Sequence, residues 1–167
     1  MSIKTIVSGW NTGADFAGIK VALQCGLNTG GYIPKGYRTE LGAKPEYKKL
    51  GAIETKLTNY SDRTAKNILQ ADCTLIFYEK LTSPGTRLTF NLCDKLKKPY
   101  LLINIKKPPL HWSVVQWLSA RNHDVVNIAG HRESVSPGIE KFVISYLSTV
   151  LYQLQGARST TDSATDF

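Results

Sequence analysis

The hydrophobic residues of this sequence fall into short apolar runs separated by stretches with helical spacing. The apolar runs predict strands at 4–8, 30–33, 73–78, 100–105 and 124–129. Helical stripes lie between most of these runs and after the last one, at 14–25, 61–71, 88–96, 112–121 and 139–154. Strands that alternate with helices imply right-handed crossovers and a parallel sheet. The pattern therefore predicts a single Rossmann-like three-layer α/β domain, in which a mostly parallel sheet carries helices on both faces.

Local signals set the ends of the first two helices. Gly26 is a typical residue to end the first helix, and the small residues of that helix suit close packing on a sheet. Ser61 is the expected N-cap of the second helix, and Ala65, Ile68 and Leu69 form its expected inner face.

The long stretch 35–58 has no clear period and is predicted to be mostly loop, with a strand near Ile53. Ordered loops of this length are often functional. Gly156 is expected to end the last helix, because only Ser, Thr, Asp and a few other residues follow it. We therefore expect residues 1–155 to form one ligand-binding domain and residues 156–167 to form a disordered tail.

Composition narrows the class of protein. Of the 167 residues, 21 are Lys or Arg and 13 are Asp or Glu, so the net charge of +8 favours anionic partners. The sequence has no basic stripe with interleaved aromatics, which would predict a nucleic-acid surface. No apolar run is long enough to predict a membrane span. The cysteines are odd in number (Cys25, Cys73 and Cys93), and neither they nor the histidines match a metal-ligand spacing. We expect free thiols, no metal site and a cytoplasmic protein.

The unusual residues follow four predicted strands. Glycines, hydroxyls and cations gather at 9–15, 34–38, 83–87 and 130–138. Ligands of open parallel sheets bind beyond the carboxyl ends of the strands. The four segments are therefore expected to meet at one rim and form a ligand site.

Two of these segments open helices and could hold phosphate, since glycine lets backbone N–H groups approach an anion. Each also has a structural interpretation: Thr12 and Asp15 have the spacing of a capping box, and Gly85 could simply form a turn. Trp10 could stack on a base or pterin ring, or could be a packed or lid aromatic. The candidate ligand-binding residues are Gly9, Trp10, Asn11, Thr12, Gly13, Asp15, Lys35, Arg38, Arg63, Gly85, Thr86, Arg132 and Glu133.

The charged candidates have distinct expected roles. Lys35, Arg38, Arg63 and Arg132 are the expected phosphate partners, since Arg forks match phosphate oxygens. The alternative for each is a surface charge or a salt bridge. Asp15 and Glu133 are poor phosphate neighbours and are instead expected to accept hydrogen bonds from ribose hydroxyls or to orient an Arg.

With these residues in view, the chain resembles the putative molybdenum carrier family, a branch of the superfamily that includes LOG and YpsA-like proteins. Residues 8–15 resemble the family's SGGQTGAD opening, and residues 30–38 resemble its GGWCPKGRR segment. Residues 63–75 resemble its RT..N....AD.TL stretch, and 85–86 resemble its GGT turn. Residues 127–134 resemble its NVAGPRES motif. The resemblance implies a Rossmann-like fold and a nucleotide-like or cofactor-like ligand.

The sequence departs from that family in ways that affect the function. Trp10 and Asn11 stand where the family has glycine and glutamine, Pro84 replaces a glycine, and His131 replaces a proline. LOG-type hydrolases resemble one another in a turn followed by a glutamate, and Thr89 occupies that place here. A carboxylate there would serve glycosidic cleavage.

We therefore expect a non-catalytic protein, and a homo-oligomer, that binds a nucleotide or nucleotide-like phosphorylated small molecule. Three alternatives remain open. The first is a carrier of molybdenum cofactor, whose pterin phosphate would suit the same site. The second is a protein that sequesters a nucleotide-derived signal. The third is a LOG-like hydrolase of an N-glycosidic bond.

Overall fold

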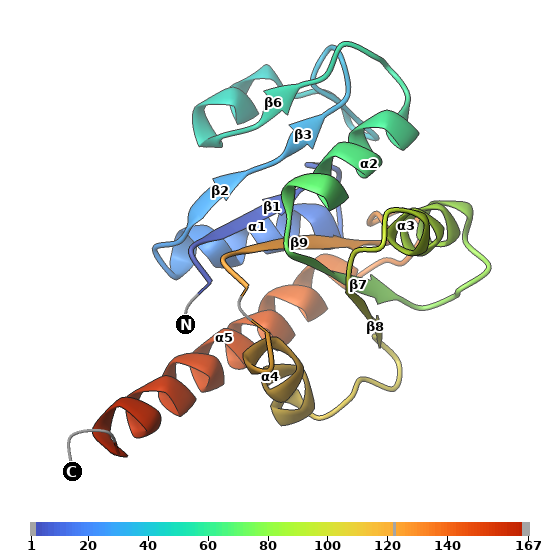
Figure 1. Cartoon of the computed structure of the whole chain (residues 1–167). Helices are drawn as coiled ribbons and strands as arrows, with labels where there is room; N and C mark the ends of the chain where they lie inside the picture. Colours follow the sequence, from blue (N-terminus) through green and yellow to red (C-terminus); the bar gives the residue numbers. More distant parts are fainter. Residues whose placement is uncertain (1–2, 122, 165–167) are drawn as a thin grey trace.

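The computed structural model describes residues 3–121 and 123–164 and forms three layers (Figure 1). Its helices and strands alternate along most of the chain. They are β1 (Thr5–Ser8), α1 (Ala14–Gln24), β2 (Asn28–Gly30), β3 (Tyr32–Ile33), β4 (Arg38–Thr39), β5 (Gly42–Ala43), a 3₁₀ helix (Pro45–Leu50), β6 (Ile53–Glu54), α2 (Tyr60–Gln70), β7 (Cys73–Tyr78), α3 (Pro84–Lys95), β8 (Tyr100–Asn104), α4 (His111–Ser119), β9 (Val125–Gly130) and α5 (Ile139–Ala164).

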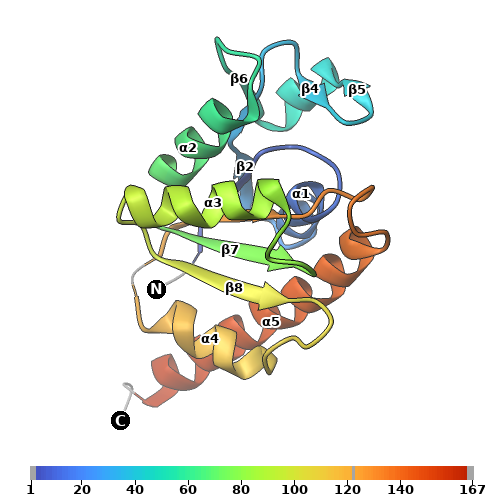
Figure 2. The same ribbon diagram turned by 90° about the vertical axis from the view of Figure 1, so that its right-hand side faces the viewer.

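The central sheet has five parallel strands in the order β2-β1-β9-β7-β8. Helices α1, α4 and α5 cover one face, and α2 and α3 cover the other (Figures 1 and 2). The last strand, β9, lies in the middle of the sheet between β1 and β7. The predicted three-layer α/β architecture is confirmed, and the carboxyl ends of β1, β9 and β7 lie next to one another.

The main hydrophobic core lies under α1, α4 and α5. Gly18 of α1 sits against the side chain of Ile128, with no room for a Cβ between them, which explains the small-residue face of this helix. The long helix α5 buries an apolar stripe on the same core. The buried members of this stripe are Ile139, Val143, Tyr146, Leu147, Val150, Leu151 and Leu154.

A second, smaller core holds the segment 34–58 against the domain. Trp10 is fully buried there with Ile19, Ile33 and Ala52. The Trp10 indole N–H donates to the carbonyl oxygens at positions 30 and 31, at 3.1 and 3.2 Å. The segment itself contains a short hairpin (β4 and β5), a 3₁₀ helix, and β6, which pairs with β3. The predicted strand near Ile53 is confirmed, but the rest of the segment is more ordered than the sequence pattern indicated.

Two predicted boundaries are wrong. The expected strand at 30–33 is two strands, β2 and β3, separated by Gly31 at a φ of 110°. Helix α5 continues past Gly156 to Ala164, because a glycine lowers the stability of a helix without preventing helical backbone. Of the predicted disordered tail, residues 165–167 lie outside the described residues.

Helix α2 differs from its prediction at its start and on its inner face. Asn59, and not Ser61, is the N-cap, and its Oδ1 accepts from the Asp62 N–H at 2.8 Å. Leu69 is 53% exposed, so its predicted place on the inner face is wrong. The buried positions of α2 include Arg63 and Asn67, so this helix packs partly through polar groups.

Candidate functional site

A pocket of about 370 Å³ lies between α2 and α3, over β9 and at the carboxyl ends of the central strands. This volume is near the lower end of the range of about 300–1,000 Å³ that is typical of small-molecule sites. Seven of the predicted ligand-binding residues line it. They are Gly9, Asn11, Asp15, Arg63, Gly85, Thr86 and Arg132.

The amino-terminal end of α3 supplies free backbone donors to this pocket. Pro84 is the first residue of the helix and has no N–H. The first hydrogen bond of the helix runs from the Arg87 N–H to the Ser83 oxygen, at 3.0 Å. Among the described contacts, the N–H groups of Gly85 and Thr86 therefore have no acceptor. Two unpaired N–H groups at the positive end of a helix form a suitable anion site.

His131 gives the Thr86 hydroxyl a defined hydrogen-bonding role. The Lys80 N–H donates to His131 Nε2 at 3.2 Å, so this nitrogen carries a lone pair. Burial lowers the pKa of His131, and the neutral ring then has its proton on Nδ1. Nδ1 lies 3.0 Å from Thr86 Oγ1 and donates to it. The hydroxyl proton of Thr86 is left for another acceptor in the pocket.

The same geometry argues against a hydroxyl nucleophile. To take a proton from Thr86, His131 would need a lone pair on Nδ1 as well as on Nε2, and a neutral imidazole has only one. Thr89, which stands in place of the glutamate of LOG-type hydrolases, donates from Oγ1 to the Gly85 oxygen at 2.9 Å. Thr89 therefore stabilises the first turn of α3, and Thr86 keeps a hydroxyl proton that it can donate to a ligand.

The loop before α1 is already hydrogen-bonded internally. The Asn11 N–H donates to Asp15 Oδ2, and the Thr12 N–H donates to Asn11 Oδ1 at 2.9 Å. Gly13, at a φ of 76°, packs against the backbone of the chain after β9, and a Cβ would clash there. Gly13 is also the N-cap of α1 without a side-chain cap, so the capping-box interpretation of Thr12 and Asp15 is wrong. The N–H groups of Asn11 and Thr12 are therefore already paired, and this first loop supports the pocket wall.

Asp15 and Arg63 form a buried ion pair in the pocket wall. Arg63 Nη1 lies 3.3 Å from Asp15 Oδ2 and also donates to the Gly9 oxygen. Burial raises the pKa of Asp15 to about 6 against the opposing charge of Arg63, and burial lowers the pKa of Arg63. Arg63 is only 7% exposed, yet its Nε has no partner among the described residues. A buried donor without a partner in a pocket wall is a feature of a ligand site.

At the rim, Arg132 pairs with a residue that the sequence analysis did not select. Its Nε lies 3.4 Å from Glu40 Oε2, and its side chain is 47% exposed. Glu40 also accepts hydrogen bonds from the hydroxyls of Thr12 and Ser134. Although burial alone would raise the pKa of Glu40, these hydrogen bonds and Arg132 lower it. Glu40 thus remains charged and ties the segment 34–58 to the rim of the pocket.

The other six predicted residues, which include Thr12 and Gly13 of the loop before α1, lie outside the pocket lining. Lys35 and Arg38 are exposed on the segment 34–58, and the Arg38 guanidinium lies 5.2 Å from the Tyr60 ring centroid. The Glu133 carboxylate accepts from the N–H groups of residues 138 and 140, so it caps the start of α5. Trp10 is fully buried in the second core, as its packed interpretation predicts, and it is not among the residues that line the pocket.

Asn127 lies at the floor of the pocket and was not among the predicted site residues. It is 2% exposed, and its Nδ2 donates to Thr74 Oγ1 at 3.2 Å. Its Oδ1 has no partner among the described residues. The sequence carried a signal for it, since Asn127 is a polar residue in the continuous apolar run Val125–Ala129 of a buried parallel strand.

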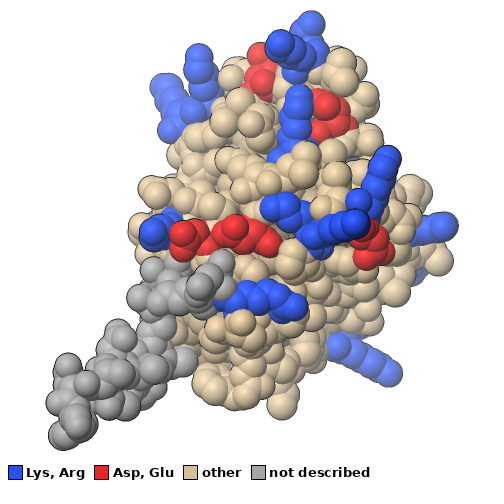
Figure 3. Space-filling view, in the orientation of Figure 1, with Lys and Arg blue, Asp and Glu red and all other residues tan. Residues whose placement is uncertain are grey.

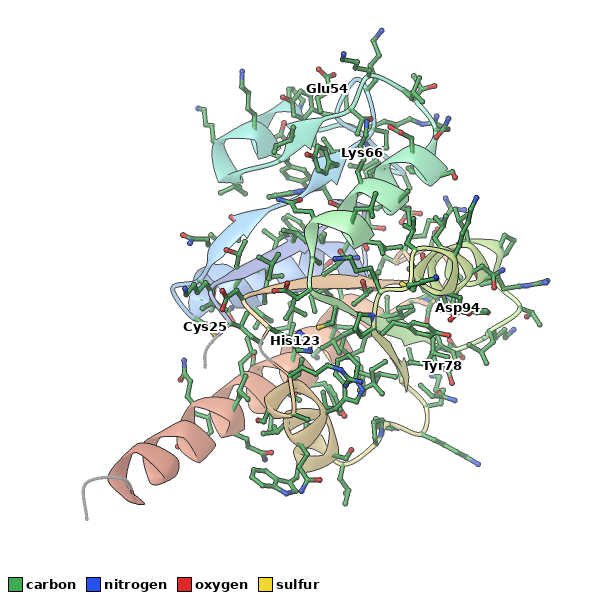
Figure 4. The ribbon with its side chains drawn as sticks, viewed as in Figure 1. Cys25, Glu54, Lys66, Tyr78, Asp94 and His123 are labelled. Atoms are coloured by element: carbon green, nitrogen blue, oxygen red, sulfur yellow. The ribbon has the colours of Figure 1, made fainter. Side chains whose placement is uncertain are left out.

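The remaining findings concern metals, thiols and membranes. Across 3–121 and 123–164, no three His, Cys, Asp or Glu side chains gather as a metal site, and Cys25, Asp94 and His123 lie on separate parts of the molecule (Figure 4). All three cysteines are free. On the face in Figure 3, basic side chains are scattered and not gathered in one stripe. No described helix has the length and apolar character that a membrane crossing requires.

Comparison with known proteins agrees with this architecture. The model of the circularly permutated YpsA SLOG family matches residues 6–151. The crystal structure of a protein named "Putative molybdenum carrier protein", from Syntrophus aciditrophicus SB, superposes with a TM-score of 0.82. It is 33% identical in sequence, and the match covers 89% of this chain and 94% of that one. Among curated proteins, none matches significantly.

Proposed function

The chain belongs to the circularly permutated YpsA SLOG family, and from this premise we propose that it binds a nucleotide or nucleotide-like phosphorylated small molecule without turning it over. The phosphate would lie at the start of α3, against the N–H groups of Gly85 and Thr86. The Thr86 hydroxyl and Arg132 would complete its hydrogen bonds. The rest of the ligand would lie between α2 and α3.

One observation carries this proposal. The free N–H groups of Gly85 and Thr86, the available proton of Thr86 and the half-exposed Arg132 all border the same pocket. Each of these groups can donate a hydrogen bond to a ligand. A site composed of donors at the positive end of a helix is complementary to a phosphate group.

The direct test is to identify what the purified protein carries. Mass spectrometry of small molecules released by denaturation should find a phosphorylated compound, and calorimetry should then show that it rebinds. Thr86→Val removes the hydroxyl with little change in volume and should weaken rebinding. Thr58→Val, in an exposed loop position, is the control and should leave binding unchanged. Normal binding by the Thr86 variant would place the phosphate elsewhere.

A second candidate is a carrier of molybdenum cofactor, which the name of the 33% identical structure favours. The cofactor's phosphate would fit the same donors at α3, and its pterin ring would lie between α2 and α3. When bound, this cofactor supplies oxygen-atom transfer chemistry through its metal. Cys73 and Cys93 are buried and neither lines this pocket, so neither would be a metal ligand at this site. A released pterin in the mass spectrum would decide for this candidate.

Turnover distinguishes a binding or sequestering protein from a LOG-like hydrolase. Asp15 is the single carboxylate among the described residues that line the pocket, and it is paired with Arg63. Incubation with nucleoside monophosphates and ADP-ribose derivatives should release no base on chromatography. Repeated turnover that is lost in Asp15→Asn would instead make the protein an enzyme. Stoichiometric binding without turnover would be shared by the binding and sequestering roles.

A further inference from the structure

We propose that the floor of the pocket binds a hydrogen-bond donor on the part of the ligand remote from its phosphate, and that Asn127 Oδ1 is the acceptor. The ligand would be a phosphate ester whose other end carries N–H groups of a heterocycle or hydroxyls of a sugar. This inference rests on the proposed phosphate site at α3 and adds the chemistry of the opposite end of the ligand.

The position of Asn127 directs its side chain toward the pocket. Side chains alternate between the two faces of a strand, and Ile128 contacts Gly18 of α1 on the apolar face. Asn127 therefore faces α2 and α3, where it lines the pocket together with Ala129. Only 2% of the surface of Asn127 is exposed.

Thr74 sets the orientation of the Asn127 amide. The Asn127 Nδ2 donates to Thr74 Oγ1 of the neighbouring strand β7, at 3.2 Å. Oδ1 is the other polar atom of the amide, and it has no partner among the described residues. Because Asn127 lines the pocket, we assign this free acceptor to the side of the pocket.

A phosphate at the mouth cannot satisfy this acceptor. Asn127 is three residues before Gly130, the end of β9, and thus about 10 Å down the strand. A fully ionised phosphate also has no proton to donate. Buried polar atoms are nearly always hydrogen-bonded, and Oδ1 of Asn127 has no partner among the described residues. A different group of the ligand, one that carries an N–H or O–H, fits this position.

The pocket thus has opposite polarity at its two ends. At the mouth, Gly85, Thr86 and Arg132 present donors, whereas the floor presents an acceptor. A compound with an anion at one end and a donor at the other matches both ends. Inorganic phosphate matches only the mouth, so the two parts of the site can be tested separately.

The test is calorimetry of the full chain with inorganic phosphate, ribose 5-phosphate, AMP and IMP. Asn127→Leu removes the acceptor at similar volume, and Asn127→Asp keeps an acceptor at the same place. In Asn127→Leu, the affinity for the donor-bearing esters should fall by roughly tenfold or more, the effect of losing one hydrogen bond to a buried group. The affinity for inorganic phosphate should stay within about twofold.

The panel also identifies the donor. A loss that already includes ribose 5-phosphate assigns the contact to a sugar hydroxyl. AMP carries an exocyclic amino group where IMP has a carbonyl. A loss confined to AMP therefore assigns the contact to the base. Asn127→Asp should retain more binding of the affected ester than Asn127→Leu. Thermal unfolding of both variants shows that the fold is kept.

The outcomes separate this inference from the proposed function. If all four compounds bind wild type and Asn127→Leu equally, the inference is overturned while the phosphate site stands. If wild type binds none of them, including inorganic phosphate, both proposals are overturned. If Asn127→Leu weakens inorganic phosphate as much as the esters, Asn127 acts on the whole fold of the pocket and the inference fails.

Discussion

The two faces of the central sheet differ in the kind of side chain that covers them. Under α1, α4 and α5, the contacts are apolar and close, as between Gly18 and Ile128. Under α2 and α3, buried positions include Arg63, Asn67 and Asn127, and a pocket remains between the helices. Apolar packing supplies most of the stability of a domain, whereas buried polar groups require specific partners. The first face therefore stabilises the fold, and the second is free to recognise a ligand.

The largest expected effect breaks the apolar face. Leu147→Ala removes a side chain of α5 that is 1% exposed and leaves a cavity, so it should lower the free energy of unfolding by about 2–5 kcal/mol. Urea denaturation measures this change. The affinity of the folded fraction for ligand should be unchanged, since Leu147 lies on the far face from the pocket.

Leu69→Ala is the matched control for this comparison. It makes the same substitution on α2, where the side chain is 53% exposed. The free energy of unfolding should change by no more than about 0.5 kcal/mol. Equal losses from Leu147→Ala and Leu69→Ala would show that the two faces do not differ as described.

A second prediction tests recognition on the polar face. Arg132→Ala should weaken binding of a phosphorylated ligand by about 1.5–3 kcal/mol, the range for a hydrogen bond to a charged group. The salt dependence of binding should also decrease, because a partly exposed charge is screened by salt. Lys35→Ala is the control: it removes a cation that lies outside the pocket and should leave calorimetric affinity unchanged. A comparable loss from Lys35→Ala would bring the segment 34–58 into the site.

A third prediction concerns the small core around Trp10. Trp10→Phe keeps an aromatic ring but removes the indole N–H that donates to the oxygens of Gly30 and Gly31. The free energy of unfolding should fall by about 1–3 kcal/mol. Any ligand-induced change in tryptophan fluorescence should survive the substitution, since Trp10 does not line the pocket. Loss of that fluorescence change would restore Trp10 to the ligand site.

The smallest effect is a pH dependence that comes from Asp15. Burial raises its pKa from 3.8 to about 6, so the folded state holds this proton more tightly than the unfolded state does. The resulting stabilisation of the folded state is complete below pH 3.8, the unfolded pKa, and is lost as pH rises through about 6, the folded pKa. Between about pH 4 and about pH 7, the stability of Asp15→Asn should therefore fall less than that of wild type. Parallel curves, measured by denaturation across this range, would contradict the assignment.

Much of the fold could be predicted because its signals are local. Apolar runs and helical stripes located four of the five strands of the central sheet, whereas the run 30–33 covers only the last residue of β2 and then β3. The start of α3 could be selected from Gly85 and Thr86 because a glycine and a hydroxyl at a helix start suit an anion. The rule that ligands bind at the carboxyl ends of parallel strands gave the correct edge of the sheet for the pocket.

The parts that could not be predicted depend on contacts between distant residues. Glu40 meets Thr12 and Ser134 only because the segment 34–58 folds back over the start of α1. Lys35 is exposed and does not line the pocket, although it follows a strand just as the other candidates do. Glu133 was predicted from its charge, but it caps α5, a role that depends on how the chain turns after β9.

The imidazole of His131 also has a consequence for the charge state of a ligand. The Lys80 N–H donates to His131 Nε2, and His131 Nδ1 donates to Thr86 Oγ1. The hydroxyl proton of Thr86 is therefore available to an acceptor on the ligand. A phosphate dianion presents more negative charge to this proton and to the N–H groups of Gly85 and Thr86 than a monoprotonated phosphate does, so these donors favour the dianion. Affinity for a phosphate monoester should then follow the ester's second ionisation, near about pH 6. The selection would come from a residue that does not itself change charge.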